Sequence, residues 1–297
     1  MISAGSAYLR ACELDVAVRK PGNVSVASPG HRMTAADFIN SARASVAAIS
    51  EPGARVGARI EAAVRATQAA VGCNTNLGIV LLAAPIALAC ERCAERTAPA
   101  LRAALANVLS ETDIDDARAT YRAIALAAPA GLGRAPQADV AVPPSISLRA
   151  AMSLAAERDR VARQYRDGGA ELFELGLPAL EQGVEAVFLA FLASAPDSHI
   201  VRKHGPGPAQ AVTDEARAWQ HRAARGEAVA ADPAFAAWDE SLKARGLNPG
   251  TSADLTVATL MVAIWLAQNV IASPDRKAPF GIDIDPNGDK PWQRSIA

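Results

Sequence analysis

The sequence has little of what several large protein classes require. Only 4% of its 297 residues are aromatic, four are cysteines, and 30 Lys and Arg nearly balance 31 Asp and Glu. Four cysteines in a chain of this length are typical of reduced thiols in a cytosolic protein. A net charge of −1 gives no broad positive field for nucleic acid or anionic lipid. We therefore expect a cytoplasmic protein that binds neither nucleic acid nor membrane.

Long hydrophobic runs and the common nucleotide or hydrolase motifs are also missing. The run 77–90 is shorter than the roughly 20 residues that a bilayer requires, and 255–272 contains Gln268 and Asn269. Both runs are typical of buried core helices. No Gly-x-x-x-x-Gly-Lys-Ser/Thr loop, Gly-x-Gly-x-x-Gly turn or Gly-x-Ser-x-Gly elbow is present, which disfavours P-loop, Rossmann and serine hydrolase chemistry.

What the sequence does have is helical periodicity. Apolar residues recur every three or four positions, and only 138–142 resembles a strand. We therefore predict an all-α fold, with one compact multi-helix domain over 1–272 and an irregular C-terminal tail over 273–297. The predicted helices are 5–18, 34–48, 54–70, 76–94, 98–109, 113–128, 147–165, 169–194, 208–224, 233–245 and 251–272.

Four breaks between these helices hold polar residues that a plain turn does not need. They are 20–25, 72–78, 197–205 and 248–254, whereas 131–136 and 141–144 are typical of simple connectors. We expect the four polar segments to converge on one site.

Two of the polar segments lead directly into apolar helices. Short polar side chains in Asn74-Thr75-Asn76 can cap the free backbone amides of the helix that follows, and such amides can also bind an anion. In the second segment, Thr251 or Ser252 is the expected cap, and Asp254 falls in the first turn. Capping alone remains an alternative at both places.

Charged clusters supply further candidates. Asp113 and Asp116 share a helix face at i, i+3 and could bind a divalent cation, although acids are also common in a first turn, with Arg118 as a local partner. Asp197 lies close to Arg202 and Lys203, a combination that suits a polyphosphate or a solvated charge cluster.

In this order, the segments resemble the triphosphoribosyl-dephospho-CoA synthase family, which is all-helical. The matching pieces are Glu13 with 20–25, Gly30-His31 with Asp37-Phe38 and Ser41, 72–78, Asp159 with Gln164-Tyr165, 197–203 and 248–254.

The resemblance implies that ATP donates a 5-triphosphoribosyl group to the ribose 2′-hydroxyl of dephospho-CoA, with release of adenine, during the synthesis of a prosthetic group. Such a substitution needs a base, a grip on three phosphates and negative charge near the anomeric carbon. Asp116, Asp159 and Asp254 are the candidate catalytic residues, and Asp113, Asp116 and Asp197 are the candidate magnesium ligands. The candidate substrate-binding residues are Lys20, Gly22, Asn23, Ser25, His31, Asn74, Thr75, Asn76, Gly78, Ser198, His199, Arg202, Lys203, Asn248, Gly250 and Thr251.

One departure from the family pattern concerns the acceptor. Citrate- and malonate-associated members carry Asn-Thr-His-Lys-Gly where this chain has Asn74-Thr75-Asn76-Leu77-Gly78, so it resembles a divergent branch. An acceptor from a methanopterin-like one-carbon cofactor pathway is therefore one alternative, and a ribosyl hydrolase and a non-catalytic nucleotide-binding protein are two others. Alanine-rich helical faces are compatible with a homodimer.

Overall fold

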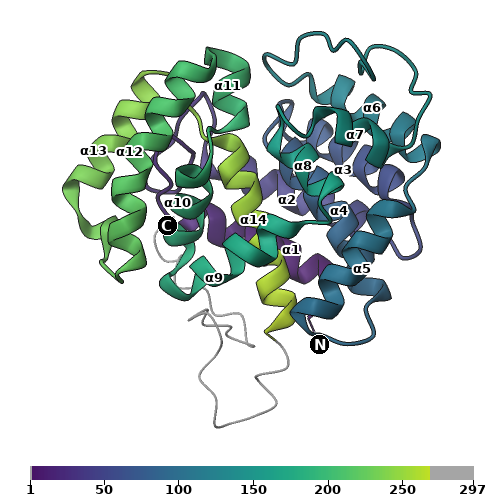
Figure 1. The fold of residues 1–297 in the computed structure, drawn as a ribbon, viewed down its shortest axis with the longest axis horizontal. Helices are drawn as coiled ribbons and strands as arrows, with labels where there is room; N and C mark the ends of the chain where they lie inside the picture. Colours follow the sequence, from purple (N-terminus) through teal and green to yellow (C-terminus); the bar gives the residue numbers. More distant parts are fainter. Residues whose placement is uncertain (1, 268–297) are drawn as a thin grey trace.

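The all-α prediction is confirmed by the structure, a computed structural model that describes residues 2–267 (Figure 1). This span contains fourteen α-helices and no strand, and isolated bridges join Ser25 to Ser28 and Gly30 to Met33. The strand-like stretch 138–142 is irregular loop. The predicted tail 273–297 and the last residues of the predicted helix 251–272 lie outside the described residues.

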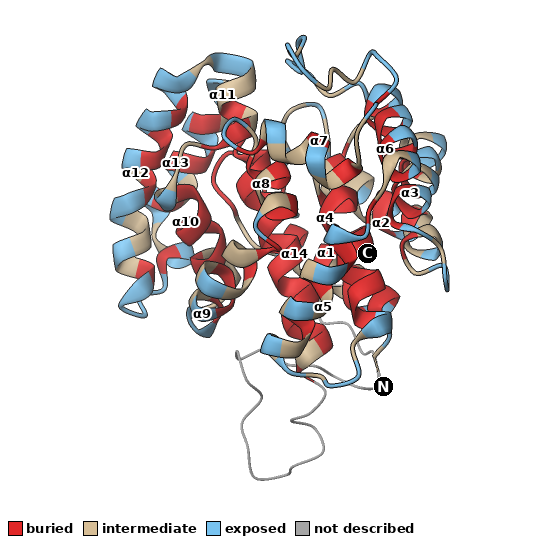
Figure 2. Cartoon of the chain, turned by 45° about the vertical axis from the view of Figure 1, so that its right-hand side comes forward, coloured by how far each residue is buried: buried red, intermediate tan, exposed pale blue. Residues whose placement is uncertain are grey.

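Three helices form the centre of the molecule: α1 (Ala4–Ala17), α4 (Leu77–Arg92) and α14 (Gly250–Leu266). Between Gly250 and Trp265 every residue of α14 is buried except Asp254. Between Leu77 and Cys90 every residue of α4 is buried except Gly78. Helices that are apolar on all sides must be enclosed by others, as Figure 2 shows. The two exceptions mark the place where the core opens.

Further helices cover this centre on two sides (Figure 1). One side contains α2 (Ala35–Ile49), α3 (Val56–Val71), α5 (Ala98–Ser110), α6 (Ile114–Ala127), α7 (Leu148–Ala155) and α8 (Arg160–Arg166). The other contains α10 (Val184–Ser194), α11 (Ser198–His204), α12 (Pro206–Ala224) and α13 (Pro233–Ala244). This second group has its own apolar core, which includes the packed rings of Trp219, Phe235 and Trp238.

The predicted helix 147–165 is two helices. Asp159 accepts a hydrogen bond from Ala162 N and so begins α8 after a break. A short polar side chain that satisfies a free amide favours a new start over continuation.

The predicted helix 169–194 is also divided. It consists of a π-helical turn (Leu172–Gly176), α9 (Leu177–Ala179), a 3-10 turn (Leu180–Gln182) and α10. Gly183, with a φ of +105°, separates the last two. A further 3-10 turn covers Val229–Ala231. The region 198–204, predicted as part of a loop, forms α11.

None of the helices within residues 2–267 is by itself both long and apolar enough to cross a membrane. The pair α10 and α11, bent by 52° at the break between them, meets the length and composition test only when taken together.

Candidate active site

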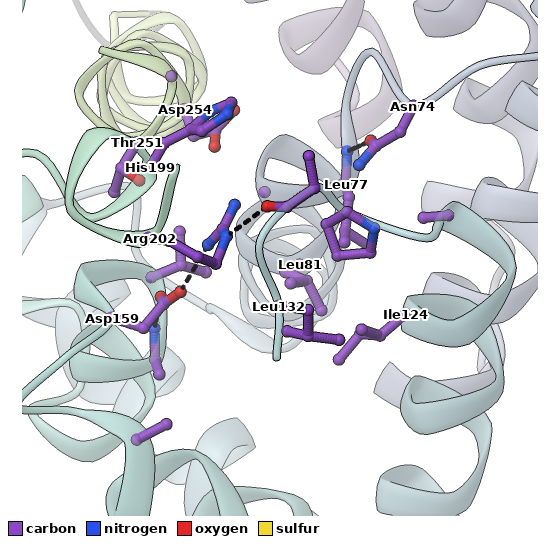
Figure 3. Close-up of a pocket in the computed structure, with 18 of the residues that line it drawn as sticks. Asn74, Leu77, Leu81, Ile124, Leu132, Asp159, His199, Arg202, Thr251 and Asp254 are labelled. Carbon is purple, nitrogen blue, oxygen red and sulfur yellow. Dashed lines mark hydrogen bonds and ion pairs between the residues drawn. The ribbon is translucent and has the colours of Figure 1, made fainter. Parts of the chain in front are cut away.

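All four polar segments contribute to one cavity of about 650 Å³ (Figure 3). Its volume lies within the roughly 300–1,000 Å³ that is usual for small-molecule sites. The predicted residues that line it are Asn23, His31, Asn74, Thr75, Gly78, Asp159, His199, Arg202, Lys203, Asn248, Gly250, Thr251 and Asp254. The cavity therefore brings together groups that are up to two hundred residues and more apart in the sequence.

Asp254 projects from α14 into this cavity. Among residues 2–267 its carboxylate has no hydrogen-bond or ion-pair partner. Burial raises the pKa of Asp254 well above its ordinary value, and the nearby carboxylates of Asp197, Asp15 and Asp159 raise it further. A Cβ atom at Gly78 would lie 2.0 Å from Asp254 Oδ2, so a glycine is needed for α4 to pass this close.

Another carboxylate at the cavity wall, that of Asp15, was not predicted. The Nζ atom of Lys20 lies 3.1 Å from Asp15 Oδ2 and also donates to the Asp15 carbonyl oxygen. The ammonium group of Lys20 is therefore buried against α1 and does not line the cavity. Asp15 Oδ1 has no partner among the described residues. Burial raises the pKa of Asp15, while Lys20 opposes the shift.

The positive groups of the cavity come mainly from α11. Arg202 Nη1 lies 3.5 Å from Asp159 Oδ2, and Arg202 Nε donates to the Ala130 carbonyl at 3.1 Å. Lys203 is exposed at the cavity wall. Two cations on one short helix suit an anionic ligand.

The two cavity histidines are neutral near pH 7. Burial, together with the charges of Arg202 and Lys203, lowers the pKa of His199 to about 3. Burial also lowers the pKa of His31, whose Nε2 lies 2.8 Å from the Gly22 carbonyl oxygen. Both imidazoles can therefore exchange hydrogen bonds with a ligand without adding charge.

Two further arginines line the cavity and were missed, namely Arg134 and Arg158. Arg134 belongs to the segment 131–136, which the sequence indicated as a simple connector, yet the loop 128–140 lines the cavity. Gly131 has a φ of +74°, and a Cβ there would lie 2.7 Å from the Arg202 carbonyl oxygen. In the sequence, Gly131 and Gly133 before Arg134 were the only feature that could have indicated a role for this loop in the site.

The α4 segment is held as the capping pattern predicted. Asn74 Oδ1 accepts from Leu77 N at 3.1 Å, and the hydroxyls of Thr75 and Ser41 lie 2.6 Å apart. In the other two loops, Asn23 Nδ2 donates to Asn248 Oδ1 at 2.8 Å. These contacts fix the loops relative to one another.

The expected cap of α14 is wrong in detail. The helix begins at Gly250, so Thr251 and Ser252 lie within its first turn and Asp254 lies just beyond it. The cap comes from another segment: Asp197 Oδ2 accepts from both Ser252 N and Ser252 Oγ at 2.8 Å. Asp197 Oδ1 accepts from His199 N and Ile200 N. Asp197 thus joins the first turns of α11 and α14.

Several other predicted residues lie behind the cavity wall. Ser198 Oγ accepts from Arg160 N at 2.9 Å, and Gly22 N donates to Asp239 Oδ1 at 2.8 Å. The predicted residues that do not line the cavity are Lys20, Gly22, Ser25, Asn76, Asp113, Asp116, Asp197 and Ser198.

Asp113 and Asp116 occupy the first turn of α6. Each forms one half of a capping box, and Arg55 Nη2 lies 2.6 Å from Asp113 Oδ2 and 2.8 Å from Asp116 Oδ2. Gly57 N donates to Asp116 Oδ1 at 2.9 Å. The two carboxylates thus tie α6 to the start of α3. Within residues 2–267, no group of three His, Cys, Asp or Glu side chains is arranged to hold a metal ion.

Comparison with known proteins identifies a family whose members match this chain in sequence or in fold. The family model described as ATP:dephospho-CoA triphosphoribosyl transferase matches residues 2–271. The chain is also similar to the crystal structure of a proposed triphosphoribosyl-dephospho-CoA synthase from Archaeoglobus fulgidus, with a TM-score of 0.61 and 21% identity over 77% of this chain and 97% of that one. At this identity the likeness shows a shared fold. A sequence comparison with curated proteins gives no match.

Proposed function

Because the chain belongs to the ATP:dephospho-CoA triphosphoribosyl transferase family, we propose that it transfers the 5-triphosphoribosyl group of ATP to the 2′-hydroxyl of dephospho-CoA. The bond between the ribose C1′ and adenine N9 breaks, and a bond forms between C1′ and the acceptor oxygen. The hydroxyl proton leaves the acceptor, and adenine departs carrying one proton. The two substrates thereby give one triphosphoribosylated product and free adenine.

The observation that carries the proposal is the unpartnered Asp254 carboxylate inside the cavity. A carboxylate with a raised pKa is a stronger base than an ordinary one, which suits it to accept the acceptor's hydroxyl proton. Its negative charge would also stabilise the positive charge that develops on the ribose ring when adenine leaves. We assign Asp254 the role of base. Asp159, also at the cavity wall, is the candidate for a second acid or base.

The triphosphate is assigned to the cationic part of the cavity. Arg202 and Lys203 are the predicted contacts, and Arg134 and Arg158 extend the same charge. The first residues of α4 and α14 also line the cavity, and the positive ends of two long helices favour a bound anion. Together these groups supply the positive charge that three phosphates require.

The predicted magnesium set, Asp113, Asp116 and Asp197, is a poor fit to a metal ion. Each of these carboxylates already accepts backbone N–H groups, and the first two also pair with Arg55. Magnesium usually binds one or two carboxylates together with substrate phosphates. Asp159 and Asp254 are two of the cavity carboxylates that could contact a magnesium ion carried by ATP; Asp15 and Asp139 also line the cavity.

Incubation of the purified protein with magnesium-ATP, with and without dephospho-CoA, tests the proposal. We expect free adenine only when dephospho-CoA is present, together with an adduct of the mass of dephospho-CoA plus triphosphoribose. Release of adenine without an acceptor would instead indicate a ribosyl hydrolase. Binding of ATP without adenine in either tube would contradict the proposed reaction, and a pteridine-type acceptor would then be the next to test.

A further inference from the structure

The cavity has two chemically different sides, and the proposed transfer accounts for one of them. Figure 3 shows the acidic and basic groups from α8, α11 and α14 on one side. The other side holds Leu77, Leu81, Ile124 and Leu132, which we call the aliphatic wall, with Asn74 beside Leu77. Reaction at a ribose ring held by charged groups does not require this wall.

We propose that the aliphatic wall binds the pantetheine arm of dephospho-CoA, so that Leu132 selects an acceptor with this arm over a plain adenosine nucleotide. This inference rests on the proposed function, because the arm belongs to the acceptor of the proposed transfer. It adds a recognition site for a part of the acceptor that takes no part in bond formation.

The chemistry of the wall suits an aliphatic segment better than the other parts of the two substrates. A triphosphate would lose its hydration against aliphatic side chains without a charged partner, and Arg202 points towards Asp159, at 3.5 Å, and not towards the wall. Adenine can pack its ring faces on such side chains, but the nitrogens along its edge need hydrogen bonds when they are buried, and leucine and isoleucine side chains offer none. The dimethyl and methylene carbons of a pantetheine arm have no such need.

The wall is also open at one end, as a long ligand requires. Leu132 is 44% exposed although it lines the cavity, so a flexible arm can continue past it towards solvent. The amide groups of the arm can then bond to water or to loop backbone, while its carbon segments remain on the aliphatic side chains. A rigid planar base cannot place its polar groups in water and its carbon atoms on the wall at the same time along such a length.

The loop that carries Leu132 is anchored on both sides of it. Arg202 Nε donates to the Ala130 carbonyl at 3.1 Å, and Tyr121 Oη donates to the Ala138 carbonyl at 2.8 Å. Leu132 is therefore positioned over the cavity by contacts that its own side chain does not make. A substitution of this half-exposed side chain should leave the fold intact.

The test compares dephospho-CoA with ADP, which is the same nucleotide without the arm and with a free terminal phosphate. We expect Leu132→Ala to raise the KM for dephospho-CoA about five- to tenfold, since it removes side-chain carbon atoms that the bound arm would cover. The KM for ATP and the rate of transfer to ADP should not change, and Leu132→Met should behave like the wild type. Leu126→Ala is the matched control, because Leu126 is 39% exposed on α6 and does not line the cavity.

Calorimetric binding of dephospho-CoA and ADP without ATP separates this inference from the proposed function. If the wild type releases no adenine but binds dephospho-CoA more tightly than ADP, and Leu132→Ala removes the difference, the proposed function fails and the arm site stands. If transfer occurs but Leu132→Ala alters both acceptors equally, or no more than Leu126→Ala does, the inference is overturned.

Discussion

Two helix starts in this protein look alike in sequence and differ in what their carboxylates contact. At the start of α6, Asp113 and Asp116 cap their own helix and bind Arg55 and Gly57 N of α3. In the first part of α14, the cap is supplied from elsewhere by Asp197, and Asp254 has no partner among the described residues. Acids near a helix start are favourable in both cases.

The difference separates structural carboxylates from a candidate catalytic one. A carboxylate that accepts several N–H groups and faces an arginine stabilises the fold and has no spare lone pair for a substrate. A half-buried carboxylate without such partners destabilises the native state and is retained where its reactivity is used. The contrast predicts opposite consequences when the two kinds of residue are changed.

The substitution Asp254→Asn should have the largest effect, which is a loss of turnover. This change keeps the size of the side chain and removes the base, so we expect adenine release to fall by about a thousandfold. Asp116→Asn is the matched control. It should lower the free energy of unfolding by about 2 kcal/mol and leave turnover per folded molecule near that of the wild type. Equal losses of turnover in the two variants would remove the distinction between the two helix starts.

The sequence alone could not distinguish the structural carboxylates Asp113 and Asp116 from the candidate catalytic carboxylate Asp254. The spacing of Asp113 and Asp116 is as suitable for a metal ion as for a capping box, and only the position of Arg55, far away in the sequence, decides which contacts form. The all-α fold could be predicted because apolar periodicity and turn residues are local features. The convergence of the polar segments could be expected from the family resemblance, since no local pattern brings distant segments together.

What the sequence missed depends on long-range contact. The segment 131–136 has the composition of a connector, and it becomes part of the site because Ala130 meets Arg202 of α11. Lys20 looks like an exposed cation before a turn, yet it is buried against Asp15. The break at Asp159 depends on a side chain that can either continue a helix or cap a new one, and no local pattern decides between these outcomes.

Two glycines allow a second test of the difference between Asp116 and Asp254, with a smaller expected effect on turnover. Gly57 and Gly78 are each the second residue of their helix, and each lies against an aspartate of another helix. A Cβ at Gly78 would lie 2.0 Å from Asp254 Oδ2, the end of a side chain that can move, whereas a Cβ at Gly57 would lie 2.5 Å from Asp116 Cα.

Gly78→Ala should therefore displace the carboxylate of Asp254 and reduce turnover about ten- to a hundredfold, while thermal unfolding changes little. Gly57→Ala must move backbone and should lower the free energy of unfolding by about 2 kcal/mol, with turnover per folded molecule preserved. Adenine release and denaturant unfolding of both variants provide the check. A loss of stability in Gly78→Ala as large as that in Gly57→Ala would show that Asp254 is held as firmly as Asp116.

The smallest expected effect is on the pH dependence of stability. The pKa of Asp254 is raised in the folded protein, so the native state holds a proton that the unfolded chain releases at its ordinary value of 3.8. The free energy of unfolding of the wild type should therefore lose the contribution of protonated Asp254 as the pH rises from 3.8 towards the pKa of Asp254 in the folded protein. The pKa of His199 is lowered from 6.5 to about 3, so its contribution grows as the pH rises through that interval.

In the wild type, the contributions of Asp254 and His199 to the pH dependence of stability have opposite signs. Asp254→Asn removes the first contribution and should not change that of His199. The free energy of unfolding of this variant should then rise more steeply between about pH 4 and pH 6.5 than that of the wild type, with His199→Gln in the same background restoring a flatter profile. Urea unfolding at a series of pH values measures the slope. A variant whose profile runs parallel to that of the wild type would mean that Asp254 ionises in the folded protein as easily as in the unfolded chain, and its assignment as a base of raised pKa would not stand.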